Sequence, residues 1–367
     1  MSEAVVIGGG LAGGAAAALL AAQGRRVTLI ERQAGPHDKV CGEFLSVEAQ
    51  ALLVKLGLDL DALGGERIDR LRLIMGSRTV EAALPFTALG LTRRRLDGAL
   101  LVHAAGLGAK VQRGVAVRSV ARRVVETAAG SIQSDTLLLA SGKHEVRGLR
   151  RETAGAVSGQ VGFKMYFNLS DRQREALAGH IELILFDGGY AGLQLVENGV
   201  ANLCLTVTAE RFEAAGRSWD GLFAALLDEP HLQRRFEGAT PVLSRPLSIA
   251  GTPYGFLHRD RPHEISPVFR LGDQAAVIPS FCGDGMAIAL HSARLAAAAV
   301  AQGADPGLYH ARLRRGVGRQ VAMATALHRL GEGSAGRGAV VTVASLAPRL
   351  LSLAASWSRI PARALAA

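Results

Sequence analysis

The first thirty residues alternate between apolar runs and short glycine-containing turns. An apolar run at Ala4–Ile7 ends in Gly8-Gly9-Gly10, an Ala/Leu-rich stretch covers Gly13 to Gln23, and a second apolar run covers Val27–Ile30. Uninterrupted apolar runs of this length are typical of buried parallel strands, whereas alanine and leucine favour a helix. The pattern therefore predicts a strand–helix–strand unit at the start of the chain.

Apolar runs bounded by turn signals continue along the rest of the chain. Between Val161 and Val207 they are separated by Asp187-Gly188-Gly189 and Glu197-Asn198-Gly199, which predicts an antiparallel sheet in a second lobe. Helices are predicted at Arg95–Leu107, Trp219–Leu227, Met286–Ala301, Pro306–Leu330 and Ala339–Leu365, the last one broken by Pro348. Further strands are predicted at Val115–Val120, Val124–Thr127, Asp135–Ala140 and Val268–Leu271.

The turn after the first predicted strand carries a dinucleotide-binding fingerprint. Gly8-x-Gly10-x-x-Gly13 lies between this strand and the helix, and Glu31 follows Gly8 by 23 residues. Gly8 permits the tight turn, Gly10 lets the backbone approach a pyrophosphate, and Gly13 lets the helix pack closely on the strand. Glu31 is placed to bond the hydroxyls of an adenosine ribose. The motif predicts FAD or NAD binding and does not distinguish between them.

Patterns of a nucleotide-binding domain occur in both the first and the last parts of the chain, so the two lobes are predicted to be interleaved. The predicted fold class is α/β, with a Rossmann-like cofactor-binding domain and an interleaved antiparallel-sheet substrate domain. The predicted cofactor domain takes residues 1–75, 91–155 and 265–330; the substrate domain takes 76–90 and 156–264; residues 331–367 form a C-terminal helical segment.

The composition narrows the class of protein. Of 367 residues, 49% are hydrophobic and 20% are charged, which allows a sizeable core and excludes a mainly disordered chain. Cys41, Cys204 and Cys282 are too few for a disulfide framework and form no CxxC motif, so no metal site is predicted. No basic leader precedes the first strand, and the apolar runs are far shorter than the roughly 20 residues of a membrane span. The sequence predicts a cytoplasmic protein without a transmembrane span.

The formal net charge of +10 raises the question of an anionic partner. The basic residues are dispersed, and only 5% of the residues are aromatic, which leaves few platforms for stacking bases. We therefore expect no nucleic-acid binding. Two interpretations stay open: an arginine-rich codon bias, or attraction for an acidic carrier, an anionic substrate or a membrane surface contacted peripherally.

Later motifs extend the fingerprint. The sequence resembles the FAD-dependent superfamily that holds aromatic-hydroxylase-type monooxygenases, geranylgeranyl reductases and flavin halogenases. The matching pieces span residues 5–300 in the order of that family: the N-terminal fingerprint, Lys39-Val40-Cys41-Gly42-Glu43, Arg93-x-x-Leu96-Asp97, and Gly272-Asp273 continued by Pro279 and Gly283-x-Gly285.

The resemblance implies non-covalently bound FAD. It implies that Asp273 bonds the ribityl chain, and that the helix opening at Gly285 directs its positive end at the flavin pyrimidine. The cofactor-binding residues that it implies are Gly8, Gly10, Gly13, Glu31, Arg32, Lys39, Cys41, Gly42, Arg93, Ser141, Gly142, Gly272, Asp273, Pro279, Gly283, Gly285 and Met286.

The Lys39–Glu43 segment supplies candidate catalytic residues. In some relatives a similar Cys-Gly segment passes close to the flavin ring, and Gly42 would allow a close backbone approach. Cys41 is either a thiol facing the substrate or an inert buried cysteine. Glu43 is either a general acid or base, or an ion-pair partner of Lys39 or of an arginine. Tyr190, on a predicted strand of the second lobe, is the third candidate.

The chain departs from the family at several motifs. Ser141 stands before Gly142 where hydroxylases carry the acid of an Asp-Gly motif with roles in FAD and NADPH binding. Around Tyr190 the reductase motif Tyr-x-Trp-x-Phe-Pro keeps only its tyrosine, which weakens the prenyl-reductase interpretation. The halogenase segment Trp-x-Trp-x-Ile-Pro is absent, since the only tryptophans are Trp219 and Trp357, and this argues against halogenation.

These features predict an FAD-dependent monooxygenase of secondary metabolism, which hydroxylates or epoxidises an apolar or aromatic small molecule through a flavin C4a-hydroperoxide. One alternative is an FAD-dependent ene-reductase of prenyl or unsaturated chains, and another is an FAD-binding protein without turnover. Electrons are expected from NAD(P)H, or from an external flavin or ferredoxin-type reductase because Ser141 replaces the acid.

Overall fold

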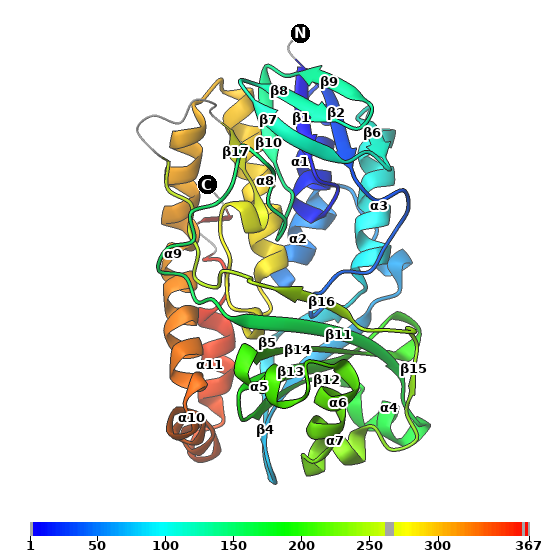
Figure 1. The fold of residues 1–367 in the computed structure, drawn as a ribbon, viewed down its shortest axis with the longest axis vertical. Coiled ribbons are helices and arrows are strands. Elements are labelled where there is room, and N and C mark those ends of the chain that lie inside the picture. The colour runs from blue at the N-terminus through cyan, green and yellow to red at the C-terminus, as the bar shows by residue number, and fades with distance from the viewer. Residues whose placement is uncertain (1–2, 261–267, 362–363, 366–367) are drawn as a thin grey trace.

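The computed structural model describes residues 3–260, 268–361 and 364–365. Two lobes lie one above the other along the long axis of the molecule, and one long helix runs beside both (Figure 1). The upper lobe contains the first strand–helix–strand unit, and the lower lobe contains a large curved sheet. The predicted α/β fold with interleaved lobes is confirmed.

A parallel sheet is the centre of the upper lobe. Within the described residues its strands follow the order β17-β10-β1-β2-β6, and β1 pairs in parallel with both β10 and β2. The strands are β1 (Glu3–Ile7), β2 (Arg26–Glu31), β6 (Lys110–Arg113), β10 (Thr136–Leu139) and β17 (Phe269–Arg270).

Both faces of this sheet are covered, which explains why its strands are continuous apolar runs. Ala4 and Val6 of β1 pack among the helices, whereas Val5 and Ile7 pack toward a small meander. The helices are α1 (Leu11–Ala22), α2 (Val47–Lys55), α3 (Arg93–Gly106) and α8 (Gly285–Ala301). The meander strands are β7 (Val117–Ala121), β8 (Val124–Thr127) and β9 (Gly130–Gln133).

The lower lobe is built on a large mixed sheet. Among the described residues its order is β15-β11-β14-β13-β12-β4-β5-β3, and β16 also pairs with β11. All neighbours are antiparallel except β4 and β12. The strands are β3 (Phe44–Leu45), β4 (Glu66–Met75), β5 (Arg78–Gly90), β11 (Gln160–Asn168), β12 (Gly179–Phe186), β13 (Gly189–Val196), β14 (Val200–Thr208), β15 (Thr240–Pro241) and β16 (Leu247–Ala250).

Short helices close the lower face of this sheet, and their apolar side chains share a core with β11, β13 and β14 (Figure 1). They are α4 (Asp171–Leu177), α5 (Ala209–Ala214), α6 (Trp219–Leu227) and α7 (Pro230–Arg235). The helix predicted at Trp219–Leu227 is α6, with the same bounds. Short 3-10 turns lie at Asp61–Leu63, Glu197–Gly199, Gly272–Gln274 and Ser280–Cys282.

One predicted domain boundary differs from the structure. The division at residue 75 assigned Glu66–Met75 to the cofactor domain, but β4 pairs with β5 along most of its length and with β12 on its other side. Because a strand belongs to the sheet that holds its hydrogen bonds, β4 belongs to the large sheet. The first crossing between the lobes therefore lies before residue 66.

Most of the described C-terminal part is helical; the helix predicted at Ala339–Leu365 corresponds to two helices, and its positions 362–363 lie outside the described residues. Helix α9 (Pro306–Glu332) runs along both lobes, and α10 (Ser334–Leu346) and α11 (Arg349–Trp357) lie at its lower end (Figure 1). The axes of α10 and α11 meet at 116°, at a break that contains Pro348. In the described part of the chain, no helix is by itself long and apolar enough to cross a membrane; α10 and α11 reach that length and composition only as a bent pair.

Candidate functional site

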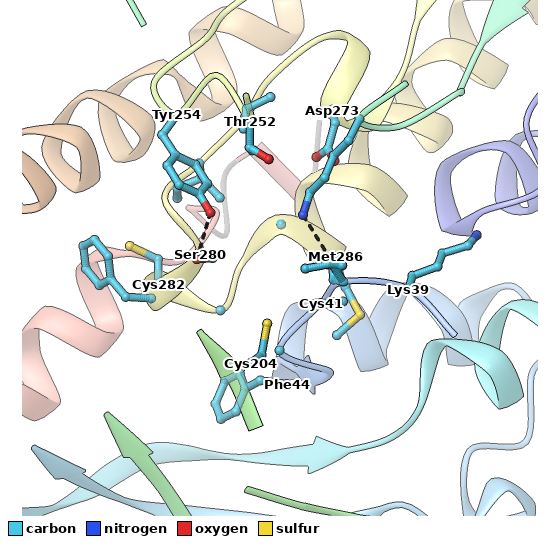
Figure 2. A pocket seen from close by; sticks show the side chains of 18 of the residues that line it. Lys39, Cys41, Phe44, Cys204, Thr252, Tyr254, Asp273, Ser280, Cys282 and Met286 are labelled. Atoms are coloured by element: carbon cyan, nitrogen blue, oxygen red, sulfur yellow. Dashed lines mark hydrogen bonds between the residues drawn. The ribbon is translucent and has the colours of Figure 1, made fainter. Parts of the chain in front are cut away.

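A single cavity of about 810 Å³ reaches from the glycine turn of β1 to the C-terminal helices. Figure 2 shows part of it, with Asp273 and Met286 on the side of the parallel sheet and Cys204 and Phe44 facing them from below. Most of the predicted cofactor residues form its wall. They are Gly8, Gly10, Glu31, Arg32, Lys39, Cys41, Gly42, Arg93, Ser141, Gly142, Gly272, Asp273, Gly283, Gly285 and Met286.

The two other predicted residues, Gly13 and Pro279, lie behind the wall. A Cβ atom on Gly13 would lie 1.8 Å from the carbonyl oxygen of Gly8, so Gly13 serves the packing of α1 against the turn. Gly8 itself has a φ of +105°, a conformation that favours glycine. Glu31 holds the turn, because its carboxylate accepts hydrogen bonds from the backbone N–H groups of Gly9 (2.7 Å) and Gln33 (2.9 Å).

The N-terminus of α1 is suited to an anion. The helix has no side-chain cap and no acidic residue in its first turn, so the N–H groups there are free to bind a negative group from the cavity. A Cβ on Gly10 would meet only the ends of two flexible cations, Arg93 Nη2 at 3.3 Å and Lys39 Nζ at 3.4 Å. Gly10 therefore leaves an open approach to the backbone between two positive side chains.

Asp97 positions these two cations. Its carboxylate bonds Lys39 Nζ at 2.7 Å, and Arg93 Nε and Nη2 at 2.8 and 2.9 Å. Burial opposes the charge on Asp97, but Arg93 and Lys39 outweigh it and hold the pKa of the carboxyl below its usual value. One carboxylate facing two cations leaves a net positive charge beside Gly10.

The N-terminus of α8 also opens on the cavity, through Gly285 and Met286. Asp284, directly before the helix, has no exposed surface, and its side chain points away from the helix N–H groups. Its carboxylate accepts from Ser46 Oγ (3.2 Å), Gln320 Nε2 (3.0 Å) and Arg359 Nη1 (3.2 Å). Burial raises the pKa of Asp284 to about 7, although Arg359 opposes this shift.

We predict that Asp284 makes the stability of the fold fall as pH rises from about 4 to about 7. In that window the folded state holds a proton that the unfolded chain releases, so the free energy of unfolding decreases with pH. Urea unfolding between pH 4.5 and 7.5 should show that Asp284→Asn removes a component of about 1 kcal/mol per pH unit from the parent profile. Asp220→Asn, at an exposed carboxylate, is the matched control; a difference between Asp284→Asn and the parent that is independent of pH would contradict the assignment.

Side chains of the large sheet hydrogen-bond to the backbone of the Lys39–Glu43 segment. Asn202 Nδ2 on β14 donates to the carbonyl oxygens of Cys41 (3.3 Å) and Gly42 (2.9 Å). Gln194 Nε2 on β13 donates to the carbonyl oxygen of Glu43 (2.9 Å). These bonds hold a loop whose last residue, Glu43, has a φ of +59°, unusual for a residue with a side chain.

The Glu43 carboxylate is the centre of a buried cluster. It forms an ion pair with Lys164 Nζ at 2.5 Å and accepts hydrogen bonds from the Tyr166 hydroxyl (2.9 Å) and the Arg93 backbone N–H (2.7 Å). Glu43 and Lys164 have no exposed side-chain surface, and Lys164 Nζ lies 4.3 Å from the centre of the Tyr166 ring. Burial raises the pKa of Glu43, and Lys164 opposes that shift.

This geometry supports the ion-pair interpretation of Glu43. Its carboxylate oxygens are engaged by protein donors, and the residue forms part of the cavity wall; a role in proton transfer stays a prediction. The partner is Lys164, whereas Lys39 and an arginine side chain were expected. Cys41 is half-buried on the cavity wall, and its Sγ accepts a long hydrogen bond from the Glu43 backbone N–H (3.4 Å).

Tyr190 belongs to a polar cluster that the sequence did not predict. Its hydroxyl lies 2.5 Å from Ser280 Oγ. Ser280 Oγ also accepts a hydrogen bond from the Tyr254 hydroxyl at 3.1 Å (Figure 2). The His328 ring packs on both tyrosine rings. Burial raises the pKa of Tyr190 and lowers the pKa of His328, so both are neutral at pH 7. All these side chains line the cavity and offer neutral hydrogen-bonding groups.

The segment after β10 forms another part of the wall. Ser141 Oγ donates to the carbonyl oxygen of His144 (2.7 Å), so it holds the local turn. Lys143, which was not predicted, donates from Nζ to the carbonyl oxygen of Val40 (3.1 Å) and joins this segment to the Lys39–Glu43 loop. Arg32 Nη2 lies 2.8 Å from His144 Nε2.

The far end of the cavity is apolar. The large sheet and the C-terminal helices enclose it with Leu71, Leu73, Leu183, Leu185, Val340, Leu351 and Trp357. The cavity thus joins a cationic end at two helix N-termini to an apolar end, with the polar cluster around Ser280 on its wall. A dinucleotide and an apolar molecule can therefore be held next to each other.

The fold combines a Rossmann-type lobe with a second, sheet-based lobe, and residues of both lobes line the cavity. Residues 6–59 match the family model of an NAD(P)-binding Rossmann-like domain. No curated protein matches the chain significantly in sequence.

Solved structures specify the class further. The flavin-dependent brominase Bmp2 superposes with a TM-score of 0.77 at 19% identity, covering 97% of this chain and 93% of its own. The halogenase PltM gives 0.73 at 16% identity over 90% of this chain and 76% of its own. The myxobacterial chondrochloren halogenase CndH gives 0.67 at 21% identity over 86% and 78%. The chain shares the fold of these flavin-dependent halogenases, which confirms the predicted resemblance at the level of the fold.

Proposed function

We propose that this protein is an FAD-dependent monooxygenase acting on an apolar or aromatic small molecule of secondary metabolism. The observation that carries the proposal is the continuity of the cavity, which joins a cationic, glycine-walled end to an apolar end without an intervening wall. One of the similar structures, PltM, has been solved in complex with phloroglucinol and FAD, a small aromatic molecule together with the cofactor proposed here.

The residues at the cationic end fit FAD. The free N–H groups of α1, with Lys39 and Arg93 beside Gly10, suit a pyrophosphate. Glu31 and Asp273 would bond hydroxyl groups of the ribose and of the ribityl chain. The N-terminus of α8, with no acidic residue in its first turn, would stabilise negative charge on the pyrimidine ring. Bound and reduced, FAD supplies the activation of O₂ that this chemistry requires.

The protein's own residues would position the substrate and exclude water. The leucines at the far end bury an apolar body. The hydroxyls of Tyr190, Tyr254 and Ser280 line the cavity, and hydroxyl groups both donate and accept hydrogen bonds, so they can bind a phenol or carbonyl oxygen of that substrate. Electrons would come from NAD(P)H or from a separate reductase. A separate reductase is considered because Ser141 stands where hydroxylases carry an acid, and its Oγ is engaged with the His144 carbonyl oxygen.

The test is a single-turnover reaction with flavin-loaded protein reduced anaerobically, followed by O₂ in the presence of a panel of phenols and unsaturated apolar molecules. We expect mass spectrometry to show a product that has gained one oxygen atom, with O₂ consumed in step. A product that gains two hydrogens without O₂ would indicate the ene-reductase instead. A product that gains bromine or chlorine when halide is added would indicate a halogenase, the activity of the similar solved structures. Protein that fails to bind FAD would contradict the proposal.

A further inference from the structure

The C-terminal hairpin, defined as α10 and α11, presents an apolar surface to solvent. Its large exposed side chains include Leu346 at 83% and Trp357 at 64% exposure, and Val343, Leu350 and Leu353 are also exposed. Between 338 and 358 the only charged residue is Arg349. A contiguous exposed stretch with a single charge is unusual for a surface that faces only water.

Helix α11 is apolar on two sides. Leu351, Ala354 and Ala355 line the cavity, whereas Leu350 and Leu353 face solvent. The wall of the apolar end of the cavity is therefore one helix thick at α11. Ser352 Oγ fixes the helix to the large sheet through a hydrogen bond to the Ala83 carbonyl oxygen (2.7 Å), so the outer side stays presented.

The charge around the hairpin points to an anionic partner. Arg349 of the hairpin is exposed, whereas Arg337 and Arg359 are buried in ion pairs with Asp187 and Asp284. Arg78 of β5 is also exposed beside α10, where its Nη1 donates to Thr342 Oγ1 (3.3 Å). Residues 333–367 contain no aspartate or glutamate, in a chain of net charge +10. A second copy of the chain would bring the same positive charge to the interface. An apolar surface flanked by positive charge is complementary to an anionic lipid bilayer, in which leucine and tryptophan side chains settle at the boundary of headgroups and acyl chains.

We propose that the C-terminal hairpin docks the protein on the surface of an anionic membrane. The 116° bend at Pro348 and the packing of α11 on β5 let the hairpin lie in the interface without crossing the bilayer. Binding of an apolar substrate by the cavity rests on the proposed function. If it holds, docking places α11, which forms the wall of the apolar end of the cavity, against the lipid in which such a substrate dissolves.

The test is flotation of the full chain with vesicles of phosphatidylcholine containing phosphatidylglycerol, compared with phosphatidylcholine alone. The test variant is Leu346→Glu/Leu353→Glu, since neither side chain lines the cavity. The matched control is Val102→Glu/Leu308→Glu, which places the same charges on exposed apolar positions of α3 and α9. We expect the parent and the control to float with the anionic vesicles. The affinity of the hairpin variant for these vesicles should be at least about tenfold lower.

Other outcomes overturn the proposal. A parent that stays in solution with both vesicle types, or equal losses in the two variants, would exclude docking by the hairpin. A parent that is dimeric by light scattering, and becomes monomeric in the hairpin variant without floating, would show that a second copy covers this surface. The measurement involves no turnover, so failure of the proposed monooxygenase reaction leaves it intact, and turnover without flotation would overturn the docking alone.

Discussion

Gly10→Val is expected to weaken FAD binding strongly while the chain still folds. Gly10 has a φ of −80° and a ψ of −172°, an extended conformation open to any residue, and an added side chain would meet only the movable ends of Arg93 and Lys39. The valine methyl groups would occupy the space through which a pyrophosphate approaches the α1 N–H groups. Titration by flavin fluorescence should show an affinity at least about 100-fold weaker, a loss near 3 kcal/mol.

Substitutions at two other glycines serve as controls for this result. Gly13→Ala should disrupt the fold itself, because its Cβ would lie 1.8 Å from the Gly8 carbonyl oxygen. Gly106→Val, at the end of α3 with no atom within 4 Å of the added Cβ, should affect neither folding nor FAD binding. Circular dichroism and urea midpoints separate the two effects. FAD binding by Gly10→Val at the parental affinity would contradict the assignment of the fingerprint.

Lys164→Met is expected to lower the free energy of unfolding by about 3–5 kcal/mol at neutral pH. The substitution leaves the Glu43 carboxylate buried without its cationic partner, which costs more than the pair itself contributes. Because burial holds the pKa of Glu43 above its unfolded value, the deficit should shrink as pH falls and the carboxylate takes up a proton.

The double variant Glu43→Gln/Lys164→Met should recover much of this loss, because no buried charge remains unpaired. Lys110→Met, at an exposed lysine on β6, is the control for loss of a positive charge. The measurement is the free energy of unfolding of each variant, obtained from urea unfolding at pH 5 and pH 8. A deficit in Lys164→Met that is the same at both pH values, or a double variant as unstable as the single one, would contradict the ion-pair assignment.

The parts of the fold that the sequence predicted are those whose signal is local. The β1–α1–β2 unit and the turn after β17 combine an apolar strand, glycines and a helix within a few tens of residues, so neighbouring positions specify them. Strand β4 was not predicted, although Arg70-Leu71-Arg72-Leu73 alternates with the period of a strand. That alternation was the available signal for its place in the large sheet.

The polar interior of the site could not be predicted, because its partners are distant in sequence. Lys164 meets Glu43 across 121 positions, and the hydroxyls of Tyr190, Tyr254 and Ser280 come from three separate segments. A sequence pattern shows that such residues are polar but not which of them become buried together. Glu43 lies on the cavity wall, yet only the geometry shows that its carboxylate is engaged by Lys164 and Tyr166.

The bond between Asp284 and Arg359 has a consequence for folding during synthesis on the ribosome. The two residues are 75 positions apart, and at ribosomal rates of roughly 5–20 residues per second the guanidinium is made about 4–15 s after the carboxylate that it neutralises. During that interval the start of α8 has a carboxylate without its arginine, so protonation or hydration of Asp284 competes with burial in the nascent chain. The parallel sheet can assemble within that time, whereas the loop at the start of α8 matures last. We therefore expect the part of the cavity wall at the start of α8 to be completed only after the C-terminal helices have docked.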